Sequence, residues 1–265
     1  MRKAVVTGST KGIGFALARE LLRLGHSVVV SGRTQAAVDD AVERLRPEAT
    51  GAATVHGLAV DVTDPEQVEK LWTAAVDALG GVDLWINNAG VAHTTRSIVE
   101  TTPDDVRAMV TTNMLGTVYG SQVAVRGMRA HGGGQIFNIL GGGSDGRIRP
   151  GMGVYSATKR GLDSFTRALA KEVAGTGVRI GQVRPGILIT EGWLREAAVA
   201  PELVAKQRKV LNILCDHVDD VAPYLVDRML ASTRNGDAVA WLTTGRMTRK
   251  FLAPRRRDVL SRYGL

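Results

Sequence analysis

Residues 4–14 read AVVTGSTKGIG, and this stretch decides the fold. A short apolar run leads into a glycine-rich turn and then into an amphipathic helix that begins near Ile13. Glycines let backbone amides approach a phosphate closely, and the positive end of the following helix favours the same anion. A tight turn without a ligand is the alternative. The glycine-rich turn lies at the first strand–helix junction, and this position favours a dinucleotide site. The site would be made of Gly8, Ser9, Thr10, Lys11, Gly12, Ile13 and Gly14.

Strand-like apolar runs and helical patterns alternate along the chain up to residue 183. The strand-like runs are apolar on both faces, which is typical of a parallel sheet covered by helices on both sides. The sequence therefore predicts an α/β fold: a single doubly wound Rossmann domain with a mostly parallel seven-stranded sheet and helices on both faces. The expected strands are 4–6, 28–30, 58–60, 84–86, 135–139, 178–183 and 238–242, and the expected helices are 13–24, 36–45, 66–79, 103–129, 155–173, 202–214 and 218–230.

The end of the second expected strand decides which dinucleotide the turn would hold. An acidic residue there would accept hydrogen bonds from a ribose 2′-hydroxyl and repel a 2′-phosphate. The chain instead reads Ser31-Gly32-Arg33, and Arg33 can donate a bidentate pair of hydrogen bonds to a phosphate that Lys11 would also reach. Two solvated surface cations are the alternative. These residues favour NADPH and NADP+ over NADH.

The composition is that of an ordinary globular protein, with 265 residues, 44% of them hydrophobic and 23% charged. The net charge of +8 is concentrated in residues 246–265, which hold seven Lys or Arg against Asp258 alone, a net +6. The remaining +2 argues against a nucleic-acid-binding surface on the body. We expect residues 1–245 to form the NADP(H)-binding catalytic domain, with a substrate lid at about 187–214, and residues 246–265 to form a basic C-terminal tail.

The tail has three interpretations: solvated charge, a subunit contact, or attachment to an anionic partner or membrane surface. The first two are favoured. Cys215 is the only cysteine, and the histidines show no metal-ligand spacing, so no metal site is expected. The chain also shows no apolar stretch of membrane-spanning length and no leader-like segment after Met1. These features predict a cytoplasmic protein.

Tyr155 and Lys159 form the candidate catalytic pair. They lie four residues apart, so a helix places them on one face. A free tyrosine titrates near ~10, and an adjacent ammonium favours the phenolate, so we expect a lowered pKa for Tyr155. Such a phenol can exchange a proton with a substrate near neutral pH.

From residue 4 to about residue 190 the chain resembles the short-chain dehydrogenase/reductase family. Beside the glycine turn, the resemblance rests on Asp61-Val62, Asn87-Asn88-Ala89-Gly90, Asn113, Tyr155 with Lys159, and Pro185-Gly186 with Thr190. It implies a homodimer or homotetramer built through the helices that contain Asn113 and Tyr155. It also implies further cofactor contacts from Asp61, Val62, Asn88, Ala89, Gly90, Tyr155, Lys159, Pro185, Gly186, Ile187 and Thr190. Satisfaction of buried backbone groups is a second interpretation of the two asparagines at 87 and 88.

The family resemblance also implies the catalytic roles. Tyr155 would protonate a carbonyl oxygen, Lys159 would bind the nicotinamide ribose, and Asn113 would hold a water in the proton relay. A serine normally lies thirteen residues before the tyrosine, but that position is Gly142 here. We expect Ser144, on a flexible glycine run, to curl back and hydrogen-bond the substrate oxygen. The alternative is that the backbone or the substrate supplies this donor.

Within the family the chain looks nearest to the chlorophyll b reductase branch. This narrower resemblance rests on residues 134–138 with the glycine–serine cluster after them, and on residues 211–214, 218–221 and 242–243. The wider family resemblance, together with Arg33 and Lys11, implies an NADPH-dependent reductase that transfers hydride to the carbonyl of a small organic substrate, an aldehyde or a ketone. Reduction of an imine, formyl reduction as in that branch, and a non-catalytic NADP(H)-binding sensor or scaffold stay as alternatives.

Overall fold

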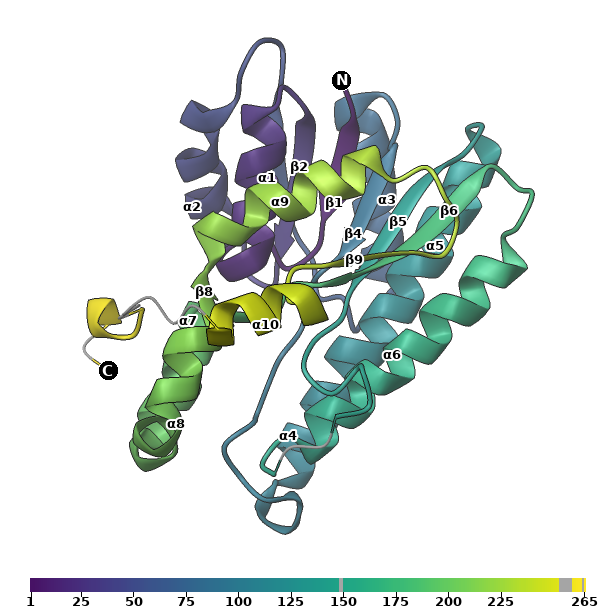
Figure 1. Cartoon of the computed structure of the whole chain (residues 1–265). Coiled ribbons are helices and arrows are strands. Elements are labelled where there is room, and N and C mark those ends of the chain that lie inside the picture. The colour runs from purple at the N-terminus through teal and green to yellow at the C-terminus, as the bar shows by residue number, and fades with distance from the viewer. Residues whose placement is uncertain (148–149, 253–258, 264) are drawn as a thin grey trace.

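A computed structural model of the chain describes residues 1–147, 150–252, 259–263 and 265. Within these residues seven strands form one sheet, in the order β3-β2-β1-β4-β5-β6-β9, and every neighbouring pair is parallel (Figure 1). This confirms the doubly wound sheet that the alternating pattern predicts. The strands are β1 (Lys3–Val6), β2 (Ser27–Gly32), β3 (Val55–Ala59), β4 (Leu84–Asn87), β5 (Gly134–Ile139), β6 (Val178–Arg184) and β9 (Asp237–Ala240).

Helices cover both faces of this sheet, and each face has its own apolar core. Successive side chains of a strand point to opposite faces, so Ala4 and Val6 of β1 enter one core and Val5 enters the other. The first core is completed by α1 (Gly12–Arg23), α2 (Gln35–Leu45) and α9 (Val218–Ala231). The second is completed by α3 (Pro65–Leu79), α5 (Gly116–Ala130) and α6 (Gly153–Glu172).

The helix expected over residues 103–129 contains an irregular turn. The structure has α4 (Pro103–Met109), a π-helical turn over Val110–Leu115, and then α5. A π turn widens the helix by one residue and is frequent at functional sites. It holds Asn113, which is fully buried. The hydrophobic pattern alone could not reveal this turn, because the apolar spacing continues through it.

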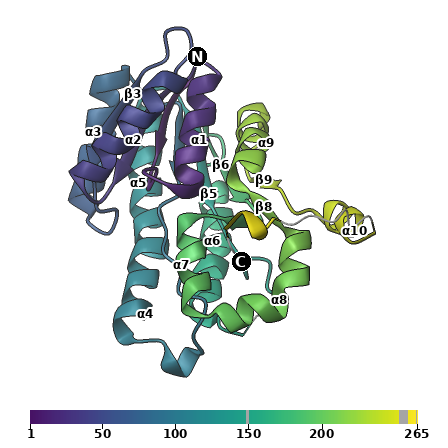
Figure 2. The same cartoon turned by 90° about the vertical axis from the view of Figure 1, so that its left-hand side faces the viewer.

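After β6 the chain forms a lid over the carboxyl end of the sheet. The lid consists of β7 (Ile187–Ile189), α7 (Glu191–Val199), α8 (Pro201–Leu214) and β8 (Cys215–His217) (Figure 2). The strands β7 and β8 pair in parallel as a separate two-stranded sheet. The sequence pattern missed this pair and α7, because three-residue strands carry too little periodicity to be recognised.

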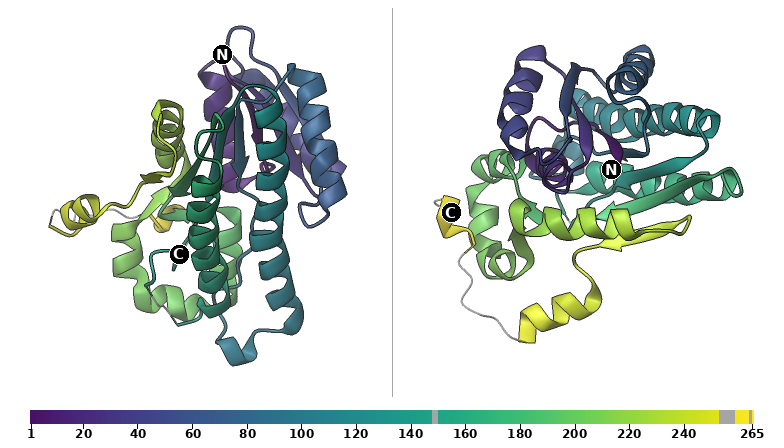
Figure 3. Two further views of the ribbon diagram at one scale, coloured as in Figure 1. Left: turned by 90° about the vertical axis from the view of Figure 1, so that its right-hand side faces the viewer. Right: turned by 90° about the horizontal axis from the view of Figure 1, so that it is seen from above.

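Part of the segment expected as a basic tail is folded. Residues Thr244–Leu252 form α10, and Ser261–Tyr263 form a short 3₁₀ helix. Figure 3 shows α10 projecting from the sheet domain at the periphery of the molecule. The arginines at 255–257 lie outside the described residues. In the part of the chain that the structure describes, no helix combines the length and the apolar character needed to cross a bilayer.

Candidate active site

The glycine turn after β1 has the geometry of a phosphate cradle. Gly8 and Gly12 adopt φ values of +61° and +59°, which other residues rarely adopt. A Cβ added to Gly14 would lie 2.6 Å from the Gly8 carbonyl oxygen and would also overlap the Asn88 amide. Lys11 is the N-cap of α1 and makes no side-chain cap, so the first amides of the helix stay open toward a ligand.

Asn88 fastens this turn to the end of β4. Its Nδ2 donates to the carbonyl oxygens of Thr7 and Gly8, both at 2.9 Å. The Thr7 hydroxyl accepts in return from the backbone amides of Asn88 at 3.0 Å and Ala89 at 3.1 Å. The Asn88 Oδ1 is buried and has no hydrogen-bond partner among the described residues. Asn88 therefore holds the glycine turn in place through its Nδ2, while its Oδ1 stays available as a hydrogen-bond acceptor.

The residues expected to set the preference for NADPH over NADH are exposed beside the glycine turn. Arg33 and Lys11 are both exposed, and neither side chain makes a hydrogen bond or an ion pair with another described residue. Asp61 is half-buried, and its Oδ1 accepts from the backbone amide of Thr63 at 2.9 Å and from its hydroxyl at 2.8 Å. Val62 packs on Gly116, where an added Cβ would lie 2.7 Å from its Cγ2. Two unpaired cations thus stand beside an open loop.

Tyr155 and Lys159 share one compartment, as the helical spacing predicts. Both belong to α6, and the Lys159 Nζ lies 5.9 Å from the centre of the Tyr155 ring. Lys159 is buried, and its Nζ donates to the Ile139 carbonyl oxygen at 3.0 Å. A Cβ added to Gly90 would lie 3.7 Å from the same Nζ, so the end of β4 borders the pair as well.

The pKa of Tyr155 shifts in the direction opposite to the expected one. Burial raises the pKa of the phenol to about 12, and burial lowers the pKa of the Lys159 ammonium to about 8. The ammonium points to a backbone carbonyl and faces the ring from 5.9 Å, so its attraction for a phenolate does not offset desolvation. In the chain alone, Tyr155 is therefore a protonated donor at neutral pH.

The glycine run after β5 is a socket for side chains of α6. A Cβ on Gly141 would overlap the Tyr155 hydroxyl, and a Cβ on Gly143 would overlap the Ser156 side chain. At Gly142, where the family serine is missing, an added Cβ would meet only the flexible end of Met152 at 2.8 Å. The sequence analysis did not assign Gly141 to the site, although the run of three glycines was the signal available.

Ser144 has a protein partner that the sequence analysis did not foresee. It is buried, and its Oγ accepts a hydrogen bond from the Arg184 Nε at 3.2 Å. Arg184 also donates from Nη2 to the buried Asp163 of α6 at 2.7 Å. The Ser144 carbonyl oxygen accepts from Arg160 at 3.0 Å. These contacts fix the glycine run to α6 and to the end of β6. They use the Ser144 Oγ as an acceptor only, so its contact with the substrate oxygen stays a prediction.

Asn113 also acts within the protein framework. Its Oδ1 accepts from the Val91 amide at 2.8 Å, and its Nδ2 donates to the Val91 carbonyl oxygen at 2.9 Å and to the Thr158 hydroxyl at 3.2 Å. All three bonds connect the π-helical turn to the segment after β4 and to α6. Both Nδ2 hydrogens are thus used, whereas Oδ1 accepts one hydrogen bond and keeps a second lone pair, so the water-holding role implied by the resemblance stays a prediction.

The turn after β6 brings the lid to the glycine cradle. Gly186, after the buried Pro185, has φ +85°, and its Cα faces Leu242, whose Cγ would lie 3.0 Å from an added Cβ. Ile187 pairs with β8, and Thr190 caps α7 by accepting from the Trp193 amide at 3.2 Å. A Cβ added to Gly12 would lie 3.7 Å from the Thr190 side chain. The predicted cofactor residues after β6 therefore lie beside those of the glycine turn after β1.

Contacts from segments distant in sequence hold the lid against the rest of the protein. The Glu196 carboxylate of α7 accepts from the Thr94 amide at 2.6 Å and lies 3.8 Å from the His93 Nδ1. On the other side, Leu260 is fully buried with Ile189 and Cys215, and its amide donates to the Asn212 Oδ1 at 3.1 Å. The described C-terminal residues thus strap the lid, which the interpretation as a solvated tail did not foresee.

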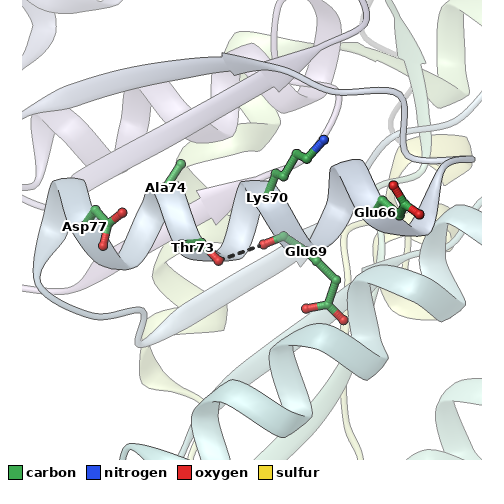
Figure 4. Close-up of a pocket in the computed structure, with 6 residues that line it drawn as sticks. All are labelled: Glu66, Glu69, Lys70, Thr73, Ala74 and Asp77. Carbon is green, nitrogen blue, oxygen red and sulfur yellow. Dashed lines mark hydrogen bonds between the residues drawn. The ribbon is translucent and has the colours of Figure 1, made fainter.

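A separate shallow hollow runs along the outer side of α3. Figure 4 shows that its lining comes from this one helix, including Glu66, Lys70 and Asp77. Acidic side chains and one lysine on a single solvated helix face provide no converging groups for chemistry. The hollow is separate from the residues around Tyr155.

Solved structures support the assignment of the fold. The L-sorbose reductase from Gluconobacter frateurii, complexed with NADPH and L-sorbose, superposes with a TM-score of 0.78 at 25% identity, over 91% of this chain and 94% of that one. The 3-ketoacyl-(acyl-carrier-protein) reductase from Brucella melitensis, complexed with NADH, gives a TM-score of 0.77 at 25% identity, over 92% and 97% of the two chains.

Sequence relatives extend the similarity. The protein described as "Probable chlorophyll(ide) b reductase NYC1, chloroplastic" from Arabidopsis thaliana is 38% identical over 93% of this chain, which spans only 51% of that relative. Carbonyl reductase family member 4 from Danio rerio is 36% identical over 75% of this chain and 81% of its own length. Residues 2–199 match the family described as short chain dehydrogenase. The chain therefore belongs to the short-chain dehydrogenase family.

Proposed function

We propose that the chain is an NADPH-dependent reductase that transfers hydride to the carbonyl of a small aldehyde or ketone. The observation that carries this proposal is the fit of the Tyr155 hydroxyl against Gly141, in one compartment with Lys159. A pKa of about 12 keeps the phenol protonated at neutral pH. A protonated phenol is a proton donor, which is the role that reduction of a carbonyl requires.

The residues present fit a dinucleotide. Gly8, Gly12 and Gly14 leave the loop backbone open, and the first turn of α1 offers its amides to a pyrophosphate. When bound, NADPH would supply the hydride. Asp61, Val62, Asn88, Ala89 and Gly90 would border the adenosine side, and Pro185, Gly186, Ile187 and Thr190 the nicotinamide side.

Within this site each catalytic residue has a separate task. Tyr155 gives its hydroxyl proton to the substrate oxygen as negative charge develops there. The Lys159 ammonium lies close enough to the ring to stabilise the phenolate that remains. Asn113 holds the segment after β4 against α6 and so keeps this pair in place.

The choice of NADPH over NADH rests on Arg33 and Lys11. Both cations are exposed and lack partners among the described residues, so neither must break an existing contact to bind a 2′-phosphate. We expect the Arg33→Ser variant to bind NADPH about tenfold or more weakly and NADH unchanged. A loss of equal size for both cofactors, measured by fluorescence titration, would contradict this assignment.

The substrate class is best tested on the wild-type chain and its Tyr155→Phe variant. The panel contains an aldehyde, a ketone, a cyclic imine and a formyl-bearing porphyrin, because relatives include chlorophyll(ide) b reductases. Turnover is followed by NADPH absorbance. We expect turnover of a carbonyl substrate, reduced by about 10³-fold in the variant, with NADPH affinity retained. Binding of NADPH without turnover of any substrate would instead favour the non-catalytic sensor.

We also propose that the chain forms a homodimer or homotetramer through the helices that contain Asn113 and Tyr155. Val110 and Leu115 of the π-helical turn are exposed apolar residues that such a contact would cover. Light scattering on the purified chain tests this state, and a monomer would contradict it. Cys215 is the only cysteine of the sequence and is buried, so it forms no disulfide within the chain, which fits a reducing compartment such as the cytoplasm.

A further inference from the structure

The helix α10 is turned with two of its three cationic side chains toward the protein. The Arg246 guanidinium stacks 3.8 Å from the centre of the Trp241 ring and 4.6 Å from that of Tyr224. One turn later, Lys250 forms an ion pair with Asp216, in which the two side chains are only 13% and 3% exposed. Cation–π and buried ion-pair contacts of this kind fix the rotation of the helix about its axis.

Two of the three apolar residues of α10 face solvent, whereas Met247 is half-buried. Phe251 is 49% exposed and Leu252 is 80% exposed. In an ordinary surface helix the apolar stripe faces the core and the charges face water. The reversed arrangement leaves two large apolar side chains at the periphery of the molecule, where α10 projects (Figures 2 and 3).

Exposed cations lie on α10 itself and on a helix that contacts it. Arg249 of α10 is exposed. The neighbouring helix α8, which contacts α10, carries exposed Lys206 and Lys209 and the exposed apolar residue Val210. Apolar side chains flanked by lysine and arginine are the combination that holds a peripheral helix at an anionic membrane interface.

We propose that α10, together with the exposed side of α8, docks on an anionic lipid surface. Phe251 and Leu252 enter the boundary between headgroups and acyl chains, and Arg249, Lys206 and Lys209 lie against anionic headgroups. Charge distinguishes this occupant from a second copy of the chain, because two such surfaces placed face to face would repel each other. Docking would bring the lid helices α7 and α8 next to the membrane.

The test uses the full chain and sedimentation with phosphatidylcholine vesicles, with and without phosphatidylglycerol. We expect the wild-type chain to sediment with the anionic vesicles only, and salt on the order of 0.5 M to release it. The double variant Phe251→Ser/Leu252→Ser should lower the apparent partition coefficient about tenfold or more, because both apolar anchors are lost. Arg249→Glu should lower it less.

Leu24→Ser is the matched control, because Leu24 is 48% exposed on the distant end of α1. It should sediment as the wild type does. All variants should keep the wild-type unfolding midpoint, since the replaced side chains are exposed. Equal sedimentation of the double variant and the wild type, or none of either, overturns the proposal. A change of oligomeric state in the double variant, measured by light scattering, overturns it in favour of a second copy.

Discussion

Two glycine-rich turns at the carboxyl edge of the sheet look alike in sequence and serve opposite purposes. The turn after β1 keeps its backbone open, because α1 begins at Gly12 without a side-chain cap. The turn after β5 is filled from inside: the hydroxyl of Tyr155 occupies the space beside Gly141. The first turn is therefore a cradle for a ligand, and the second is a socket for the protein's own side chains. Glycine removes a Cβ in both, but what occupies that space differs.

Among the glycine substitutions, the largest expected effect on kcat comes from filling the socket. Gly141→Ala forces the Tyr155 hydroxyl away from its place and should lower kcat by about 10²-fold, since displacing a catalytic group by about 1 Å has effects of this size. NADPH affinity should change little. Gly142→Ala is the control, because its Cβ meets only the end of Met152 and should leave kcat within about threefold. Similar losses in both variants, measured by steady-state kinetics, would show that the socket does not position Tyr155.

Burial of Lys159, one helical turn after Tyr155, lowers the free energy of unfolding. Its folded pKa of about 8 lies below the ordinary value of 10.5, so the unfolded chain binds this proton more tightly. The wild type is therefore penalised below about pH 8 and regains stability as the pH rises from about 8 toward 10.5. Lys159→Met should stabilise the fold by about 2 kcal/mol at pH 7 while abolishing turnover.

Thermal unfolding at two pH values checks the sign of this effect. The stabilisation by Lys159→Met should shrink at pH ~10, where the wild-type ammonium has already lost its proton in the folded state. A stabilisation that grows with pH, or a destabilised variant at pH 7, would show that the ammonium is held by favourable contacts.

A substitution in the cradle should weaken NADPH binding and leave kcat nearly unchanged. Gly14→Ala brings a methyl group to 2.6 Å from the Gly8 carbonyl oxygen, and the loop must shift to accept it. We expect a rise of about tenfold in the Kd of NADPH, with kcat at saturating cofactor nearly unchanged. Gly245→Ala is the control, because an added Cβ there meets nothing within 4 Å. Unchanged NADPH affinity in Gly14→Ala would place the cofactor elsewhere.

The smallest effect on turnover is expected at Ser144. Ser144→Ala removes a hydrogen bond from Arg184 and should lower the free energy of unfolding by about 1 kcal/mol. Turnover should stay within about threefold of the wild type, because the Ser144 Oγ is buried and is held by Arg184. A loss of about 10²-fold in kcat would instead identify Ser144 as a donor to the substrate oxygen.

The regular part of the fold was readable from the sequence. Parallel strands covered on both faces give continuous apolar runs, and the cradle residues lie close together along the chain, so both leave local signals. The helical spacing of Tyr155 and Lys159 likewise fixes their common face without any other contact. The lid was less readable, since β7 and β8 have three residues each and pair across 25 intervening residues.

By itself, the sequence determined the doubly wound sheet, the cradle and the tyrosine–lysine pair, because each depends on residues that are neighbours on one element. Only the tertiary structure decided the direction of the Tyr155 pKa shift, the pairing of Ser144 with Arg184 and the rotation of α10. Each of these depends on contacts between distant segments, such as Lys250 with Asp216 and Arg184 with Ser144. Burial and hydrogen bonding are set by what packs around a group, and no local pattern records that environment.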